Sequence, residues 1–194
     1  STFTEGITRL VEAYLELDED GAKAQKSANR SIQLNPEFSP AYLLLARIYQ
    51  KQKSSDQATL YYYKKYLDQN PSDQETAFEF AKHLFEEKQY LEVEQITSKM
   101  ADPRGLPLLG QALIHRGNHE EALVAFERYM ATLDPEEQEL YHDITLISLP
   151  REARAYRLTP PDRRKTYLEK FWLQKDPFRT SGGAMRRAEH YRRV

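Results

Sequence analysis

The feature that most constrains this 194-residue sequence is a pattern of small residues that recurs about every 34 positions. One small-residue position is held by Ala24, Ala58, Val93 and Ala122, and a second by Ala46, Ala81 and Gly110. Prolines close the units at Pro36, Pro71, Pro103 and Pro135. Small side chains at this spacing let two antiparallel helices cross closely, and one such hairpin cannot bury its apolar face alone. The pattern therefore predicts stacked helical hairpins.

The order of residues within a unit follows a known repeat. Residues 39–71 contain, in order, Leu45-Ala46, Tyr49, Ala58, Tyr62 and Pro71. Residues 103–135 contain Leu109-Gly110, Leu113, Gly117, Ala122, Phe126 and Pro135. Both units resemble tetratricopeptide (TPR) repeats, and residues 74–103 and 5–36 follow the pattern more loosely. The resemblance implies an all-α, TPR-like solenoid of about four helical hairpins over residues 1–135, the first helix falling around residues 10–17.

Residues 136–194 leave the repeat pattern and predict C-terminal capping helices. Hydrophobic spacing predicts helices over about 136–149, broken at Pro150, over about 161–175 and over about 184–193. Phe171-Trp172, Asp176-Pro177 and the ending Glu189–Val194 resemble the first half of a bacterial GWxTD domain. This resemblance implies a truncated GWxTD-like domain over 136–194 and a bacterial origin, with the cell envelope as the setting if a signal sequence was trimmed. It implies no reaction, and we expect Phe171 and Trp172 to lie in the core.

Charge is distributed unevenly along the chain. The first 149 residues carry 15 Lys and Arg against 25 Asp and Glu, whereas the last 45 carry 13 against 5. A basic end permits binding to nucleic acid or another anionic surface, although the acidic array raises the cost of approaching phosphates. The two regions can instead pair within the molecule. No apolar run reaches the roughly 20 residues of a membrane span, so we expect a chain that does not cross a membrane.

Residues with catalytic or metal-binding chemistry are sparse. The chain has no Cys, which excludes disulfides and thiolate ligands. His115 and His119 have the spacing of a helical metal pair, but Gly117-Asn118 between them predicts a turn that separates their faces. His83, His142 and His190 are isolated in the sequence, so we expect all five histidines at the surface. No nucleophile-elbow, zinc-protease or phosphate-loop motif occurs, and we expect no catalytic site, no metal and no cofactor.

The first helix of each hairpin lines the concave face of a TPR-like solenoid, and candidate binding residues are placed there by the repeat register. They form an apolar floor with a basic flank: Arg47, Lys51, Phe78, Lys82, Phe85, Arg104, Gln111 and Ile114. Such a groove suits a protein or peptide partner with apolar anchors and acidic character. Chaperone-type TPR domains grip a terminal carboxylate with asparagine at these positions, and the absence of asparagine here argues against that clamp.

We therefore expect a non-catalytic protein–protein interaction scaffold that binds a peptide or helical segment in this groove. Two alternatives stay open. The basic C-terminal segment can bind nucleic acid or an anionic surface, and the repeats can belong to a larger enzyme whose catalytic part lies outside this chain. The partner, the oligomeric state and the compartment do not follow from the sequence.

Overall fold

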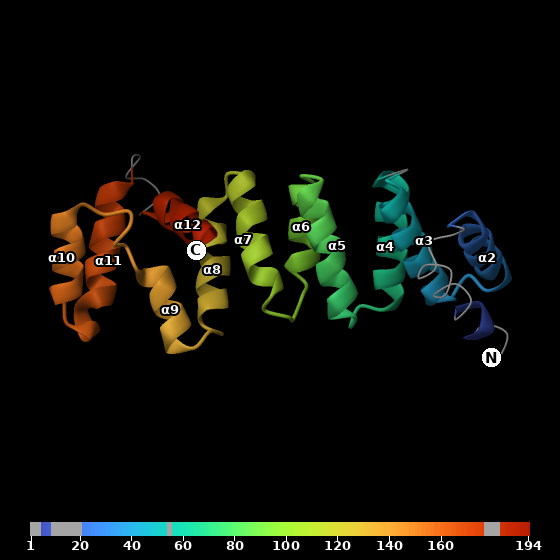
Figure 1. Cartoon of the computed structure of the whole chain (residues 1–194), viewed down its shortest axis with the longest axis horizontal. Helices are drawn as coiled ribbons and strands as arrows, with labels where there is room; N and C mark the ends of the chain where they lie inside the picture. The colour runs from blue at the N-terminus through green and yellow to red at the C-terminus, as the bar shows by residue number, and fades with distance from the viewer. Residues whose placement is uncertain (1–4, 9–20, 54–55, 177–182) are drawn as a thin grey trace. The chain divides into compact units, whose positions relative to one another are not determined.

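A computed structural model describes residues 5–8, 21–53, 56–176 and 183–194, and every regular element within these ranges is a helix. The helices pack largely as sequential antiparallel pairs (Figure 1), which confirms the all-α prediction for these ranges. The helix expected around residues 10–17 lies outside the described residues. The chain divides into two compact units, Ser1–Thr76 and Ala77–Val194. No helix of the described ranges combines the length and apolarity needed to cross a bilayer.

The helices of the first unit are α2 (Gly21–Leu34), α3 (Ser39–Gln52) and α4 (Asp56–Gln69). α3 packs against both of its neighbours. Pro40 is tolerated in the first turn of α3, because an N–H at this position has no partner within the helix. The core of α2 and α3 is formed by Ala24, Ala28, Ala41, Leu44, Leu45 and Ile48. From α4, Tyr63 is buried and its hydroxyl donates to Gln50 Oε1 at 2.6 Å.

The second unit begins within α5 and contains two helical pairs: α5 (Gln74–Glu86) with α6 (Tyr90–Thr97), and α7 (Gly105–His115) with α8 (His119–Met130). α7 packs against both α6 and α8. Side chains connect α5 with α7 at both ends, since Phe78 lies against Arg104 and Phe85 lies against His115. Residue numbers rise together along the two helices, so α5 and α7 run parallel, as the first helices of consecutive hairpins do.

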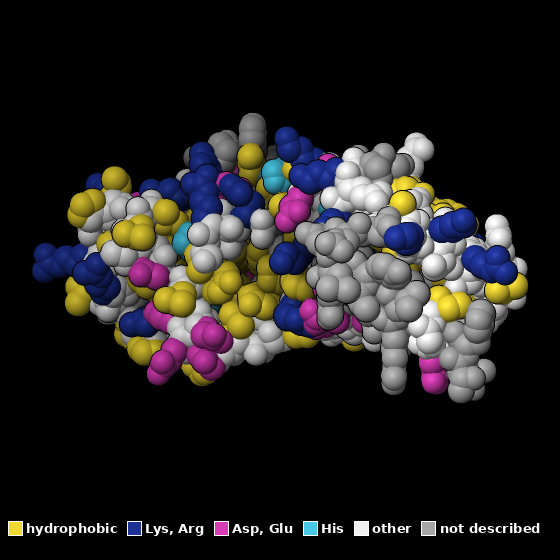
Figure 2. All heavy atoms as spheres, turned by 45° about the vertical axis from the view of Figure 1, so that its right-hand side comes forward, with side chains coloured by type: hydrophobic (Ala, Val, Ile, Leu, Met, Phe, Trp, Pro, Cys, Tyr) yellow, Lys and Arg dark blue, Asp and Glu magenta, His cyan; other side chains and the backbone are white. Residues whose placement is uncertain are grey.

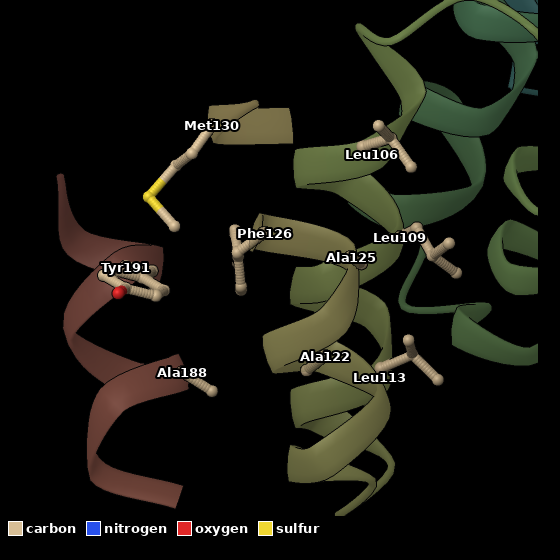
Figure 3. Close-up of a cluster of buried hydrophobic side chains, with 9 residues drawn as sticks. All are labelled: Leu106, Leu109, Leu113, Ala122, Ala125, Phe126, Met130, Ala188 and Tyr191. Atoms are coloured by element: carbon tan, nitrogen blue, oxygen red, sulfur yellow. The ribbon is translucent and has the colours of Figure 1, made fainter. Parts of the chain in front are cut away.

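The core of the α7–α8 pair is shown in Figure 3. Leucines of α7 belong to one buried cluster with Ala122, Ala125 and Phe126 of α8, and Ala122 is completely buried. Gly110 of α7 permits the close approach, because a Cβ atom there would lie 2.7 Å from the Phe126 ring. The small residues that the repeat pattern singled out at positions 110 and 122 therefore lie at the contact between the helices.

The turns inside the hairpins share one backbone feature. Lys53, Lys88 and Gly117 follow the first helix of their pairs, and their φ angles of 48°, 60° and 83° are left-handed. A left-handed residue after a helix lets the chain reverse direction, and glycine adopts this conformation without strain. The two lysines thus hold a position that glycine fits better, in residues 39–71 as well as in residues 74–103.

The C-terminal helices are α9 (Pro135–His142), α10 (Pro150–Leu158), α11 (Pro161–Lys175) and α12 (Ala184–Arg193). α12 packs against α8 and α7, and its Ala188 and Tyr191 extend the core of that pair (Figure 3). A second cluster, formed by Ile144, Tyr156, Leu168, Phe171 and Trp172, joins α10 and α11 to the segment before them. Phe171 and Trp172 are core residues, as expected, and the predicted domain boundary after residue 135 stays a prediction.

The helix predicted over 136–149 is wrong in its second half. α9 ends at His142, where Asp143 adopts an extended conformation and accepts a hydrogen bond from the backbone N–H of Thr145 at 2.8 Å. A side chain that caps the following backbone in this way competes with helix continuation. The apolar residues that followed a helical period belong to a turn, and α10, which the sequence did not predict, begins at Pro150.

Candidate functional site

A half-buried phenylalanine of the second unit, Phe78, has two cations close to its ring. Lys82 Nζ lies 5.9 Å from the centre of the Phe78 ring, and the guanidinium carbon of Arg104 lies 5.2 Å from it. Phe78 and Lys82 are one helical turn apart on α5, whereas Arg104 is the residue that directly precedes α7. Cations over an aromatic face are attracted by its quadrupole, so the three side chains support one another.

Asp102 fixes the orientation of Arg104. Its Oδ2 accepts hydrogen bonds from Arg104 Nε at 2.8 Å and from Nη2 at 2.6 Å. Hydrogen bonds from Arg104 hold the pKa of the Asp102 carboxyl below its ordinary value. Arg104 is therefore a positioned, partly neutralised cation, whereas Lys82 has no carboxylate within ion-pairing distance among the described residues.

A second aromatic group lies two turns further along α5. The rings of Tyr90 and His115 stack at 4.3 Å between centroids with 2° between their planes, and Phe85 meets both of them edge-on. Phe85 is half-buried by these contacts. The repeat register predicted Phe85, but it gave no signal for Tyr90, which begins α6 and belongs to no predicted groove position.

Gln111 and Ile114 complete the predicted set on this unit. Both are half-buried on α7, and Ile114 packs against the core cluster of α7 and α8. We call the six residues of the second unit the α5–α7 face: Phe78, Lys82, Phe85, Arg104, Gln111 and Ile114. Contacts join Phe78, Lys82 and Arg104 directly, and Phe85 contacts His115 of α7, so two separate groups of side chains connect α5 with the start and the end of α7.

Arg47 and Lys51, the remaining two predicted residues, are exposed on α3 of the first unit. Arg47 lies close to a hydrogen-bonded pair in which Tyr66 donates to Asp73 Oδ2 at 2.7 Å. Burial and the bond to Asp73 raise the pKa of Tyr66 to about 12. Burial alone would raise the pKa of Asp73, but hydrogen bonds from Tyr66 and Thr76 hold it below its ordinary value. Arg47 thus interacts electrostatically with Asp73 of its own unit, which reduces the positive charge that it offers to a ligand.

The histidines divide into two groups. His115 ends α7 and is exposed, and His119 begins α8, so the predicted turn separates them. Of the five histidines, His115 is exposed as predicted, and the other four are half-buried. His190 Nε2 lies 2.9 Å from the carbonyl oxygen of Tyr141, and its ring packs against Trp172. Burial lowers the pKa of both His190 and His142. Within the described ranges, no three or more His, Asp or Glu side chains are grouped as metal ligands.

Many cations of the basic C-terminal segment form ion pairs. The pairs are Arg164–Glu139 at 3.0 Å, Lys175–Glu152 at 3.0 Å, Arg187–Glu127 at 2.9 Å, Arg192–Glu189 at 2.7 Å and Arg193–Glu189 at 2.8 Å. Those of Arg164 and Arg187 connect the basic segment to the acidic region before it. Part of the excess positive charge of the C-terminal segment is therefore paired with acidic residues of the same molecule, which is one of the two alternatives that the sequence left open.

The sequence matches no protein-family model and is similar to no curated protein. The likeness to TPR repeats and to the GWxTD domain therefore rests on the residues that carry it.

Proposed function

We propose that this chain is a non-catalytic protein–protein interaction module whose α5–α7 face binds a segment of another protein. The observation that carries the proposal is the half-exposed Phe78 ring with the cations of Lys82 and Arg104 within 5.9 Å of its centre. Aromatic and arginine side chains are the residues that most often dominate binding energy at interfaces. The resemblance to TPR repeats supports the proposal, because the first helices of stacked hairpins line the binding groove of such arrays.

The chemistry of the face indicates the kind of partner. Phe78 and Phe85 offer apolar surface, and Lys82 and Arg104 border it with positive charge. A segment with a large apolar residue near Asp or Glu satisfies both features, since its carboxylate approaches a cation while its apolar side chain covers the ring. The cations contribute mainly to the association rate and the apolar contact to residence time.

Nucleic-acid binding is the weaker alternative. The ion pairs of Arg164, Arg187, Arg192 and Arg193 reduce the positive charge that the basic segment offers to phosphates. Sequence-independent binding depends on the number of phosphates that unpaired cations neutralise. We therefore expect only weak, strongly salt-dependent binding to a duplex.

The test is to select peptides from a random display library on this protein and to titrate the selected peptides against variants. We expect them to combine an apolar residue with Asp or Glu. Phe78→Ala should weaken binding about 30-fold or more, as for a central hot spot, and Lys82→Glu should weaken it chiefly at low salt. Leu91→Ala is the matched control, because Leu91 is an exposed apolar residue on α6, outside the face.

Unchanged affinity in both Phe78→Ala and Lys82→Glu would move the binding site away from this face. Submicromolar binding to a short DNA duplex at physiological salt, lost when Arg186, Arg187, Arg192 and Arg193 become alanine, would favour the nucleic-acid alternative.

A further inference from the structure

A cavity of about 740 Å³ lies among α11, α12 and the segment that joins α9 to α10. Phe171 and Trp172 contribute to its lining, and both are otherwise buried in the core. Its walls carry exposed apolar side chains: Leu140, Leu146, Ile147 and Val194. A volume of this size falls within the range of roughly 300–1,000 Å³ that is typical of ligand pockets. We call it the C-terminal pocket; no residue of the α5–α7 face lines it.

The apolar wall results from the turn after α9. Ile144 is completely buried, and its carbonyl oxygen accepts hydrogen bonds from the N–H groups of Ile147 and Ser148. This turn leaves Leu146 97 % exposed beside the cavity. Single exposed leucines are common, but Leu140, Leu146 and Ile147 lie around one cavity, and such a group is typical of an interaction site.

The charged side chains that line the pocket are Lys175, Arg186 and Arg193 against Asp143 and Glu189, an excess of one positive charge, and Lys175 is paired with Glu152. Glu189 accepts hydrogen bonds from Arg193, which also lines the pocket, and from Arg192, which does not, and these bonds lower its pKa to about 2. Arg186 has no ion-pair partner among the described residues. Asp143, the other acidic residue of the lining, is already hydrogen-bonded to Thr145. An occupant with carboxylates is therefore favoured over one with cations.

We propose that the C-terminal pocket is a docking site for an acidic amphipathic helix of a partner protein. The apolar face of the helix enters between Leu146 and Trp172, and its carboxylates meet Arg186 and Arg193. In Figure 2, hydrophobic and basic side chains lie next to one another over the C-terminal helices, as this mode of recognition requires. A lipid bilayer would cover a protruding loop but would leave the cavity behind it unfilled, which favours an inserted helix.

The single tryptophan of the chain provides a local readout, because Trp172 lines the pocket. The probe is a synthetic amphipathic peptide with Leu on one helical face and Glu on the other. Titration should change the Trp172 emission and raise the anisotropy of the labelled peptide. Leu146→Glu and Arg186→Glu should each weaken binding at least tenfold. Both residues are exposed, and circular dichroism verifies that the variants remain folded.

Two controls separate this pocket from other surfaces. Leu158→Glu introduces the same charge at a leucine of α10 that is 72 % exposed and does not line the pocket, and it should leave binding unchanged. Phe78→Ala should also leave it unchanged, which separates this site from the α5–α7 face.

Specific results would overturn the proposal. They are absence of binding by the Leu/Glu peptide, equal binding by a Leu/Lys peptide, and undiminished binding by Leu146→Glu. Co-sedimentation with phosphatidylserine vesicles that requires Leu146, without peptide binding, would identify a membrane surface as the occupant instead. Self-association that Leu146→Glu abolishes, without peptide binding, would identify a second copy of the chain.

Discussion

Replacement of Gly110 by alanine tests the close packing of α7 on α8. A Cβ atom at this position would lie 2.7 Å and 2.8 Å from two carbons of the Phe126 ring. The ring is buried and has Tyr191 of α12 beside it at 6.3 Å between centroids, so it has little room to retreat. Overpacking of this kind costs about 1–3 kcal/mol, whereas alanine gains about 1 kcal/mol over glycine in a helix interior.

The balance predicts that Gly110→Ala lowers the free energy of unfolding by about 1 kcal/mol. For a unit of this size, the melting temperature should fall by roughly 3–5 °C. The measurement is thermal and urea unfolding followed by circular dichroism. A second variant, Gly110→Ala with Phe126→Leu, should be more stable than the sum of the two single effects by at least about 0.5 kcal/mol, because the smaller side chain makes room for the methyl group.

Gly105→Ala is the matched control on the same helix. Its Cβ would meet only Met100, with the nearest atom, Sδ, at 3.1 Å, and a methionine side chain adjusts easily. We expect this variant to be as stable as the parent or slightly more stable. If Gly110→Ala proves equally stable, α7 and α8 do not cross as closely as this reasoning requires.

Four further predictions concern turns and charge. Gly117→Ala should cost about 1 kcal/mol in unfolding experiments, because its φ of 83° is left-handed and no atom within 4 Å would contact the new methyl group. Lys88→Gly should stabilise the protein by about 0.5 kcal/mol in the same assay, since its φ of 60° suits glycine. Burial lowers the pKa values of His142 and His190 below their ordinary value of 6.5, so the unfolded chain binds more protons than the folded chain as the pH falls below 6.5. The melting temperature should therefore fall from pH 7.5 to pH 5.5, and it should fall less steeply in a variant with glutamine at both positions. Glu189, with its pKa lowered to about 2 by Arg192, contributes stability above its ordinary value of 4.5 that is lost as the pH falls towards 2, so Glu189→Gln should lower the melting temperature at pH 7 and leave it unchanged near pH 2.

The sequence predicted the buried small residues of the helix pairs most successfully. Ala46, Ala81, Val93 and Ala122 are completely buried, so the small-residue pattern identified core positions, and at Gly110 it identified a close contact with Phe126. Ala58 belongs to the same series but is only half-buried. A small residue is required where two backbones approach, but it is also tolerated where they do not. The pattern therefore identifies the pairs better than it identifies how tightly each one packs.

It failed where a local hydrogen bond decided the backbone. Apolar residues between positions 140 and 149 follow a helical period, and nothing in that period reveals the turn that Asp143 makes with Thr145. The consequence reached the candidate sites, because residues assigned to the buried face of a helix became the exposed wall of the C-terminal pocket. Leu146 is 97 % exposed, and its role is visible only once the turn is known.

The α5–α7 face shows which contacts follow from the helical spacing of residues and which depend on tertiary packing. Phe78, Lys82 and Phe85 share one side of α5 because their spacing matches the helical repeat, and this follows from the sequence alone. The approach of Arg104 to Phe78 depends on the packing of consecutive hairpins, and its orientation depends on Asp102, two residues before it. The sequence predicts which side chains can meet, and the tertiary contacts select those that do.

Net charge was a poor guide to the binding chemistry of the last 45 residues. Their excess of cations suggested a surface for polyanions, but Arg164, Arg187 and the arginines around Glu189 have carboxylate partners at 3.0 Å or less. What a ligand encounters is the charge left after these pairs have formed, beginning with Arg186. A few unpaired cations beside exposed leucines are enough to recognise a single carboxylate that lies close to an apolar side chain. Binding of a polyanion instead needs many unpaired cations in a row. The local arrangement thus favours recognition of an acidic, amphipathic protein segment over a nucleic-acid backbone.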